Sequence, residues 1–239
     1  MQYYIGEFLG TMVLIALGAG FGSSISLNHS LSKNLSPNFL TITIAWGFAV
    51  MFGVSVAGFF ETGGHLNPAV TLAFALGGLF DWSMVAGYII AQLLGAFVGS
   101  AIVVVHYYPH FMATKPEEGN TVGIFATTPA ISTPFFNLIS EIIATFFFIF
   151  ILLLMNTGSF VAGVAPISVA FLVMAIGLSF GSTTGYAINP ARDFGPRLAY
   201  AILPIPNKGE AHWDYAWIPI LAPIIGATLA VFVFQCLVS

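Results

Sequence analysis

Charged residues are scarce in this chain: Asp, Glu, Lys and Arg together make up 6% of its 239 residues. A typical soluble domain contains about 25%. Hydrophobic residues make up 58% of the sequence, and the mean hydropathy is +0.97. Such a chain would not stay dissolved in water, so we predict an integral membrane protein that contacts a lipid bilayer. The net charge of −4 is too small to indicate a nucleic-acid partner.

Cysteine and clustered metal ligands are also missing. The single cysteine, Cys236, excludes an internal disulfide and a multi-cysteine metal site. No second His, Cys or carboxylate lies at ligand spacing from His65, so we expect this residue to line a vestibule. We expect neither a metal nor a cofactor. Residues 1–7 lack a basic region and a small-residue cleavage site, which predicts no removable signal peptide.

Long apolar runs are present instead of the short alternating segments of a membrane barrel. A bilayer core of about 30 Å requires roughly 20 apolar residues per helix. Six stretches meet this requirement: about Tyr4–Ser24, Phe39–Phe60, Ser83–His106, Phe135–Asn156, Val161–Phe180 and Tyr215–Val238. Two further stretches, about Pro68–Leu79 and Pro190–Ile202, would each cover only about 18–20 Å. We therefore predict an all-α membrane protein with six transmembrane helices and two re-entrant half-helices.

The two halves of the chain resemble each other. Glu-Phe-Leu-Gly-Thr at 7–11 is echoed by Glu-Ile-Ile-Ala-Thr at 141–145, and Ala-Gln-Leu-Leu-Gly-Ala at 91–96 by Ala-Pro-Ile-Ile-Gly-Ala at 222–227. Each copy holds three full spans, and because this number is odd, the second copy must be inverted. We predict one channel domain over 1–239, with inverted repeats at approximately 1–110 and 135–239. Such repeats place the functional site where their broken helices meet.

The tripeptide Asn-Pro-Ala begins both half-helices, at residues 67–69 and 189–191. Asparagine is a favoured helix cap, and proline suits the first helical position. The two N-termini then face each other near the midplane, each with free N–H donors and about half a positive charge. The side chains of Asn67 and Asn189 can donate hydrogen bonds into the gap. We expect a pore that admits small neutral polar molecules and repels cations and protons.

The residues around both motifs resemble those of a known family. Residues 64–71 (Gly-His-Leu-Asn-Pro-Ala-Val-Thr) and 185–197 (Gly-Tyr-Ala-Ile-Asn-Pro-Ala-Arg-Asp-Phe-Gly-Pro-Arg) are similar to the two signature loops of the aquaporin, or major intrinsic protein, family. The resemblance covers essentially the whole chain. It implies pore residues Asn67, Pro68, Ala69, Asn189, Pro190 and Ala191. It also implies a homotetramer in a bacterial plasma membrane, with one pore per subunit and cytoplasmic termini.

Within that family the chain resembles the glycerol facilitators. Asp193, Arg197 and the Pro-Ile pair at 219–220 match residues usual in that subgroup. The resemblance implies passage of glycerol and related polyols with water, and we extend the expected solutes to dihydroxyacetone and hydrogen peroxide. We expect Asp193 to brace the start of the half-helix rather than to contact a solute, since acids are favoured in a first turn.

Alignment to the motifs places a four-residue constriction at Trp46, Gly177, Tyr186 and Arg192. Arg192 supplies donors and a fixed positive charge, whereas Trp46 and Tyr186 would form an apolar corner. Gly177 stands where water-selective members have a histidine, so we expect it to leave room for a polyol. The Trp46–Asn67 interval is one residue longer than in close relatives, which we assign to an insertion around residues 61–64. Tyr186 replaces the usual phenylalanine, and its hydroxyl is the basis for expecting lactic acid.

Buried acids and serines leave other interpretations open. Glu7 and Glu141 lie within apolar spans and could couple transport to protons, although acceptance of hydrogen bonds from a loop backbone fits their repeat symmetry better. An inverted-repeat secondary transporter is the alternative function, but no acid is adjacent to Asn67. An intramembrane hydrolase based on Ser179 or Ser182 would need a nearby histidine within a span. We therefore expect a channel and not an enzyme.

Lysine placement and the resemblance disagree on orientation. Lys33, Lys115 and Lys208 follow the first, third and fifth spans. The positive-inside rule would place these loops, and not the termini, in the cytoplasm. The family resemblance implies the opposite orientation, which we adopt as the prediction.

Overall fold

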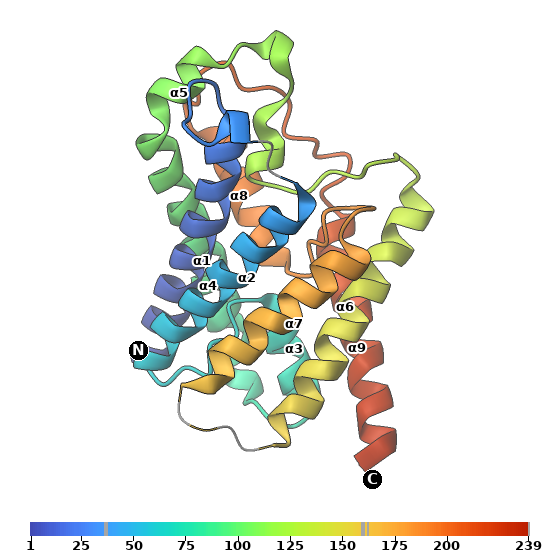
Figure 1. Cartoon of the computed structure of the whole chain (residues 1–239). Coiled ribbons are helices and arrows are strands. Elements are labelled where there is room, and N and C mark those ends of the chain that lie inside the picture. The colour runs from blue at the N-terminus through green and yellow to red at the C-terminus, as the bar shows by residue number, and fades with distance from the viewer. Residues whose placement is uncertain (36–37, 159–160, 162, 239) are drawn as a thin grey trace.

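The computed structural model describes residues 1–35, 38–158, 161 and 163–238, and the regular structure in these ranges is helical (Figure 1). The helices are α1 (Gln2–Ser26), α2 (Phe39–Phe59), α3 (Pro68–Leu76), α4 (Trp82–His106), α5 (Tyr108–Ala113), α6 (Pro134–Asn156), α7 (Val164–Phe180), α8 (Pro190–Ile202) and α9 (Ile218–Val238). Short 3₁₀ segments occur at Lys33–Leu35, Pro116–Glu118 and Thr121–Ile124. The prediction of an all-α fold is confirmed.

The long helices lie close to the predicted spans. Within the described ranges, α1, α2, α4, α6 and α9 have 21–25 residues and are apolar enough to cross a membrane. The α7 helix has 17 residues and begins at Val164 rather than at the predicted Val161. The half-helix α3 ends at Leu76 rather than Leu79, and α8 has its predicted bounds. The sequence did not predict α5 or the 3₁₀ segments, which belong to the connections.

Glycines allow the main helix pairs to cross closely. A Cβ added at Gly95 of α4 would lie 2.3 Å from the Phe8 carbonyl oxygen of α1, and one at Gly99 would lie 2.5 Å from that of Met12. The second half repeats this crossing, because a Cβ at Gly226 of α9 would lie 2.6 Å from the carbonyl oxygen of Ile142 in α6. Only a residue without a side chain fits such backbone contacts. The small residues at these positions therefore serve helix packing.

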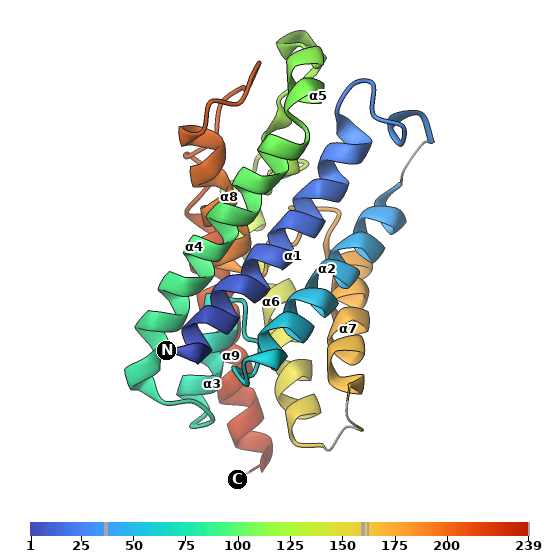
Figure 2. The same ribbon diagram turned by 90° about the vertical axis from the view of Figure 1, so that its left-hand side faces the viewer.

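The two halves pack against each other through α2 and α7, and each half-helix reaches across to the other half. In the first half α1 packs on α4 and α2, and in the second half α6 packs on α9 and α7. The α3 helix contacts α9 as well as α4, and α8 contacts α4 as well as α9. Figures 1 and 2 show α3 and α8 toward opposite ends of the molecule, with both chain termini at the α3 end. The two half-helix N-termini consequently meet in the interior.

Candidate pore and constriction

Each Asn-Pro-Ala motif forms the cap of its half-helix. The Asn67 side-chain oxygen accepts a hydrogen bond from the Ala69 N–H (2.9 Å). The Asn189 oxygen accepts from the N–H groups of Ala191 (3.0 Å) and Arg192 (3.2 Å). The prolines occupy the first turn, where a missing N–H costs nothing. Because each amide oxygen bonds to backbone donors, the orientation of each amide NH₂ group is fixed.

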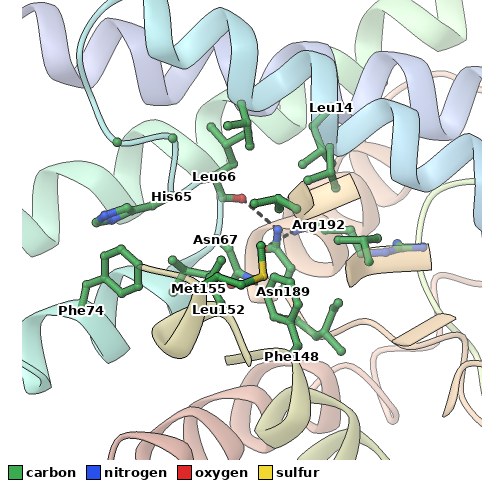
Figure 3. A pocket seen from close by; sticks show the side chains of 18 of the residues that line it. Leu14, His65, Leu66, Asn67, Phe74, Phe148, Leu152, Met155, Asn189 and Arg192 are labelled. Atoms are coloured by element: carbon green, nitrogen blue, oxygen red, sulfur yellow. Dashed lines mark hydrogen bonds between the residues drawn. The ribbon is translucent and has the colours of Figure 1, made fainter. Parts of the chain in front are cut away.

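Those NH₂ groups connect the two motifs. Asn67 Nδ2 donates to the carbonyl oxygen of Ile188, and Asn189 Nδ2 donates to that of Leu66, each at 2.8 Å. Figure 3 shows the bond between Asn189 and Leu66 beside the cavity. An amide NH₂ has two hydrogens, so each asparagine keeps one further donor. Two fixed donors and two helix N-termini therefore face the same region.

The backbone before each motif adopts left-handed conformations. Leu66 has a φ of 50°, Tyr186 of 37° and Ile188 of 43°. This region is uncommon for residues other than glycine and is unfavourable for a β-branched residue such as Ile188. Backbone of this kind persists when its surroundings hold it in place, and it is concentrated at functional sites. The surroundings here are two buried glutamates.

Glu7 holds the first loop. Its Oε1 accepts hydrogen bonds from the His65 N–H and the Thr62 hydroxyl, both at 2.9 Å. Its Oε2 accepts from the Leu66 N–H (2.7 Å) and from Gln92 Nε2 (2.8 Å). The carboxylate is fully buried, and all four contacts supply donors to it. These contacts fit the interpretation in which Glu7 accepts hydrogen bonds from a loop backbone, rather than the one in which it couples transport to protons.

Glu141 holds the second loop through the same two backbone positions. Its Oε1 accepts from the Ala187 N–H at 2.9 Å, and its Oε2 accepts from the Ile188 N–H at 3.1 Å. Glu141 is also fully buried. The repeated glutamates thus stabilise equivalent segments just before Asn67 and Asn189.

His65 lies at the edge of the cavity and is surrounded by aromatic rings. Its Nδ1 lies 3.1 Å from the Thr71 hydroxyl oxygen, and its ring centroid lies 4.7–5.2 Å from those of Phe74, Phe80 and Tyr88. The described residues contain no group of three or more His, Cys, Asp or Glu side chains that could hold a metal ion. His65 is among the side chains that line the cavity, and its role as a vestibule residue stays a prediction.

A cavity of about 210 Å³ extends from the loop containing His65 past both asparagines to Arg192. The loop residues provide one polar wall. Apolar side chains from α2, α6 and α7 provide the rest, among them Val50, Leu152 and Val173. Figure 3 shows Asn67 and Asn189 between the loop residues and the apolar side chains of Phe148, Leu152 and Met155. A solute in this cavity would meet hydrogen-bonding groups on one side and hydrocarbon on the other.

Three of the four constriction candidates line this cavity: Trp46, Tyr186 and Arg192. The guanidinium carbon of Arg192 lies 4.1 Å from the centroid of the Trp46 ring. Arg192 Nη1 also donates to the Phe125 carbonyl oxygen at 3.2 Å. The stacking and the hydrogen bond hold the cationic group at one end of the cavity.

Gly177, the fourth candidate, does not border the cavity. A Cβ added there would lie 2.2 Å from Thr43 Cγ2 and 2.8 Å from Tyr186 Cζ. The structure therefore does not contain the open space that the sequence led us to expect beside Gly177. The Tyr186 hydroxyl is buried, and it has no hydrogen-bond partner among the described residues. We had expected this hydroxyl in the constriction, but it lies on the helix side of the ring because Gly177 leaves space there.

Asp193 braces the region around Arg192. Its Oδ1 lies 2.8 Å from Arg197 Nη2, and its Oδ2 accepts hydrogen bonds from the Thr127 N–H (2.7 Å) and hydroxyl (2.6 Å). Arg197 also donates to the carbonyl oxygen of Thr127 at 2.8 Å. Both ion-pair side chains are fully buried. Both carboxylate oxygens are thus engaged away from any solute.

Sequence reasoning did not single out Phe125, Thr127 or Thr43. Phe125 and Thr127 lie in an irregular connection, and no pattern in that segment signals a contact with the second half-helix. The interval of three residues from Thr43 to Trp46 on one helix was a usable signal, since residues so spaced share a face.

Opposed half-helices around a lined cavity in an apolar helical fold define a membrane pore protein. The sequence matches the Major intrinsic protein family over residues 1–234, and the chain belongs to this family.

Its relatives include solute facilitators. The chain is 54% identical to glycerol uptake facilitator protein 2 of Lactiplantibacillus plantarum, over 231 residues that cover 96% of this chain and 97% of that protein. It is 44% identical to the glycerol uptake facilitator protein of Bacillus subtilis, covering 95% and 82% respectively. The X-ray structure of the aquaglyceroporin from Plasmodium falciparum aligns with a TM-score of 0.85 at 29% identity, covering 99% of this chain and 96% of that one. The protein is a membrane transport protein and not an enzyme.

Proposed function

We propose that this protein is a passive channel for glycerol and related small uncharged polyols, and that it excludes protons and ions. The observation that carries the proposal is the opposed pair Asn67 and Asn189, each with one uncommitted amide donor beside the cavity. The names of its relatives, which are glycerol uptake facilitators at 44–54% identity, support the choice of solute.

Permeation in this proposal depends on exchange of hydrogen bonds. A polyol hydroxyl accepts from the free donors of Asn67 and Asn189, while its carbon chain contacts the apolar wall. The two helix N-termini add positive potential at the same place, so a cation or hydronium is repelled there. Arg192 adds a permanent charge at the end of the cavity. Neutral solutes meet no such barrier.

Trp46, Gly177, Tyr186 and Arg192 form the constriction in this proposal. Trp46 and Tyr186 contact the carbon chain, Arg192 donates to hydroxyls, and Gly177 accommodates the Tyr186 ring. Water, dihydroxyacetone, hydrogen peroxide and protonated lactic acid are small and uncharged, and we propose them as further solutes of the same path. Because the Tyr186 hydroxyl is buried on the helix side of its ring, we expect Tyr186→Phe to leave the ratio of lactic acid to glycerol permeability unchanged, and a lower ratio in that variant would show that the hydroxyl favours the acid.

We further propose a homotetramer in a bacterial plasma membrane, with one pore per subunit and both termini in the cytoplasm. Both termini lie at one end of the molecule, and the connections after α1, α4 and α8 lie toward the other (Figures 1 and 2). Two of the loop lysines have local roles there. Lys33 Nζ donates to the Ser26 carbonyl oxygen (3.0 Å) at the end of α1, and Lys208 Nζ donates to those of Ala201 (2.7 Å) and Leu203 (2.8 Å) at the end of α8. Helix-end capping explains these lysines without a cytoplasmic location.

Stopped-flow measurements on vesicles that contain the purified protein test the proposal. We expect rapid glycerol flux with a low activation energy, no saturation and no dependence on an ion gradient, while a pH-sensitive dye reports no proton flux. Empty vesicles and vesicles with the Arg192→Ala variant are the controls, and the variant should change the relative permeability of solutes. Saturable or ion-coupled flux would favour the secondary transporter instead.

A further inference from the structure

Three residues from separate elements meet behind the Tyr186 wall of the cavity. Thr43 lies on α2, Gly177 on α7, and Tyr186 in the loop before α8. A Cβ built on Gly177 would be 2.2 Å from the Thr43 methyl carbon Cγ2, and 2.8 Å and 3.0 Å from Cζ and Cε2 of the Tyr186 ring. The methyl group and the ring thus both fill the space that a side chain at Gly177 would need.

The Tyr186 ring is enclosed on its helix side. A Cβ added at Gly181, the cap residue that follows α7, would lie 2.4 Å from Tyr186 Cδ1. The Phe39 ring contacts Tyr186 edge-on, with centroids 6.3 Å apart. Thr43 is fully buried and Tyr186 is 6% exposed. Because protein interiors tolerate few voids, the position of the ring is determined by the groups packed behind it.

The same ring borders the cavity together with Trp46 and Arg192. Trp46 follows Thr43 by three residues, so both project from one face of α2. We propose that Thr43 is a specificity-determining residue: its methyl group sets how far the Tyr186 ring stands into the constriction, and thereby which solutes pass. Thr43 acts by positioning Tyr186 and does not contact the solute. The proposal rests on the constriction described under the proposed function.

The two substituents of Thr43 have separate partners. Its hydroxyl donates to the carbonyl oxygen of Phe39, within its own helix, whereas its methyl group lies against Gly177, beside the space that the Tyr186 ring also borders. Serine at this position would keep the hydroxyl and remove the methyl group, and valine would do the reverse. The Tyr186 hydroxyl, which is buried and has no hydrogen-bond partner in the part of the chain that the structure describes, provides a second reason for the ring to move. A space beside it would admit a water molecule that satisfies the hydroxyl.

The test compares glycerol with erythritol, a polyol that is one carbon longer, in stopped-flow measurements on vesicles. Thr43→Ser should raise the ratio of erythritol to glycerol permeability about tenfold, the discrimination that one methylene provides in an apolar pocket. Thr43→Val, the matched control, should leave the ratio within about twofold of the starting protein, because it keeps the packing methyl. Equal ratios for Thr43→Ser and Thr43→Val would overturn the proposal.

Gly177→Ala provides an independent arm. The added methyl group should push the Tyr186 ring into the cavity and reduce glycerol permeability, and the double variant Thr43→Ser with Gly177→Ala should recover part of it. Absence of recovery in a correctly folded double variant would contradict the coupling. If Gly177→Ala does not fold, the comparison of Thr43→Ser with Thr43→Val still tests the role of Thr43.

Variants at Arg192 and Trp46 separate the two levels of the proposal. If Arg192→Ala and Trp46→Ala both leave the erythritol to glycerol ratio unchanged, the proposed constriction is wrong. If they change the ratio while Thr43→Ser does not, the constriction remains and only the role of Thr43 is rejected.

Discussion

The two loops that meet in the pore are each held by a buried glutamate, but the other side chains that stabilise them differ. In both halves a buried glutamate accepts two consecutive backbone N–H groups just before the asparagine, from His65 and Leu66 in one loop and from Ala187 and Ile188 in the other. The first loop has further neutral side-chain contacts inside the membrane region. The half-helix after the second loop, α8, is instead connected to neighbouring segments by a charged pair, Asp193 and Arg197.

Sequence positions that match in the two repeats show how the supports diverged. Gln92, which donates to Glu7 (2.8 Å) and to Thr71 (3.0 Å), matches Pro223, which has no side-chain donor. Thr71, four residues after Asn67, matches Asp193, four residues after Asn189. The carboxylate that stands in place of this hydroxyl forms a buried ion pair with Arg197.

The charged support belongs to the half that carries Arg192. Arg197 also donates to the carbonyl oxygens of Ala211 (2.6 Å) and His212 (3.1 Å), so the pair joins the second half-helix to two connections. Asp193 pairs with Arg197, and within the described ranges no ion pair is formed by Arg192, whose side chain lines the end of the cavity. The comparison indicates that the first loop is built mainly for stability, whereas the second also keeps a charge in position.

Arg197→Met tests the charged support and should have the largest effect on stability. Removal of one partner from a buried ion pair costs about 3–5 kcal/mol, because the other charge stays buried without compensation. We expect a clear decrease in the thermal unfolding midpoint in detergent, together with a changed solute selectivity as Arg192 loses its support.

The double variant Asp193→Asn with Arg197→Met is the control for Arg197→Met. It should be less destabilised than the sum of the two single variants, since no unpaired charge remains. Additive losses would mean that the pair does not act as a unit.

Glu141→Gln and Glu7→Gln compare the two anchors directly. Each change replaces one acceptor oxygen with an NH₂ group that faces a backbone N–H, at a cost of about 1–3 kcal/mol for an unsatisfied buried donor. We expect the smaller loss for Glu7→Gln, because the side-chain oxygen of Gln92, which has no partner in the described ranges, can accept from the new amide after a side-chain rotation. Thermal unfolding of both variants in the same detergent measures the difference.

A variant that removes the Gln92 amide tests why Glu7→Gln and Glu141→Gln should differ in stability. In a Gln92→Met background, Glu7→Gln should lose its advantage and become as costly as Glu141→Gln. If Glu7→Gln is the more destabilising change in the starting protein, the proposed adaptation by Gln92 is wrong.

The helices could be predicted from the sequence because their signals are local. Apolar length defined the long spans, and the Asn-Pro pairs defined the first residues of α3 and α8. Helix ends were predicted less well, as at Leu76, because the end of a half-helix depends on what packs against it. In the structure the side-chain amide of Gln235 donates to the Leu76 carbonyl oxygen at 3.3 Å, a contact from the far end of the chain.

The candidate site was only partly predictable, for a similar reason. Motifs identify residues whose own chemistry is needed, such as Asn67 and Arg192, and they leave out residues that act by filling space. Gly177 illustrates the limit, since its absent side chain was interpreted as room for a solute. The space is in fact filled by Thr43 and Tyr186. Thr43 lies on α2 and Tyr186 in the loop before α8, so the sequence around Gly177 on α7 gives no sign of either contact.

The threonines that follow the two glutamates provide a finer comparison. Thr11 and Thr145 occupy matching positions and are both fully buried. The Thr11 hydroxyl donates to the Glu7 carbonyl oxygen at 2.7 Å, whereas the Thr145 hydroxyl has no partner in the described part of the chain. We expect Thr11→Val to cost about 1 kcal/mol and Thr145→Val to be neutral or slightly stabilising, because only the first loses a hydrogen bond. The thermal unfolding midpoints of the two variants test this expectation. Equal losses of stability would mean that the Thr145 hydroxyl forms a hydrogen bond in the membrane.

Cys236 gives the smallest expected effect and tests whether the second half exposes a thiol to the pore. The cysteine is exposed near the end of α9 and does not line the cavity, and the first half contains no cysteine. A mercurial that attaches there would remain outside the path of the solute. We therefore expect glycerol flux in vesicles to decrease little after mercurial treatment, and the Cys236→Ser variant to respond in the same way as the starting protein. Strong inhibition that disappears in Cys236→Ser would place the end of α9 against the pore and would contradict the position of the cavity derived from the two asparagines.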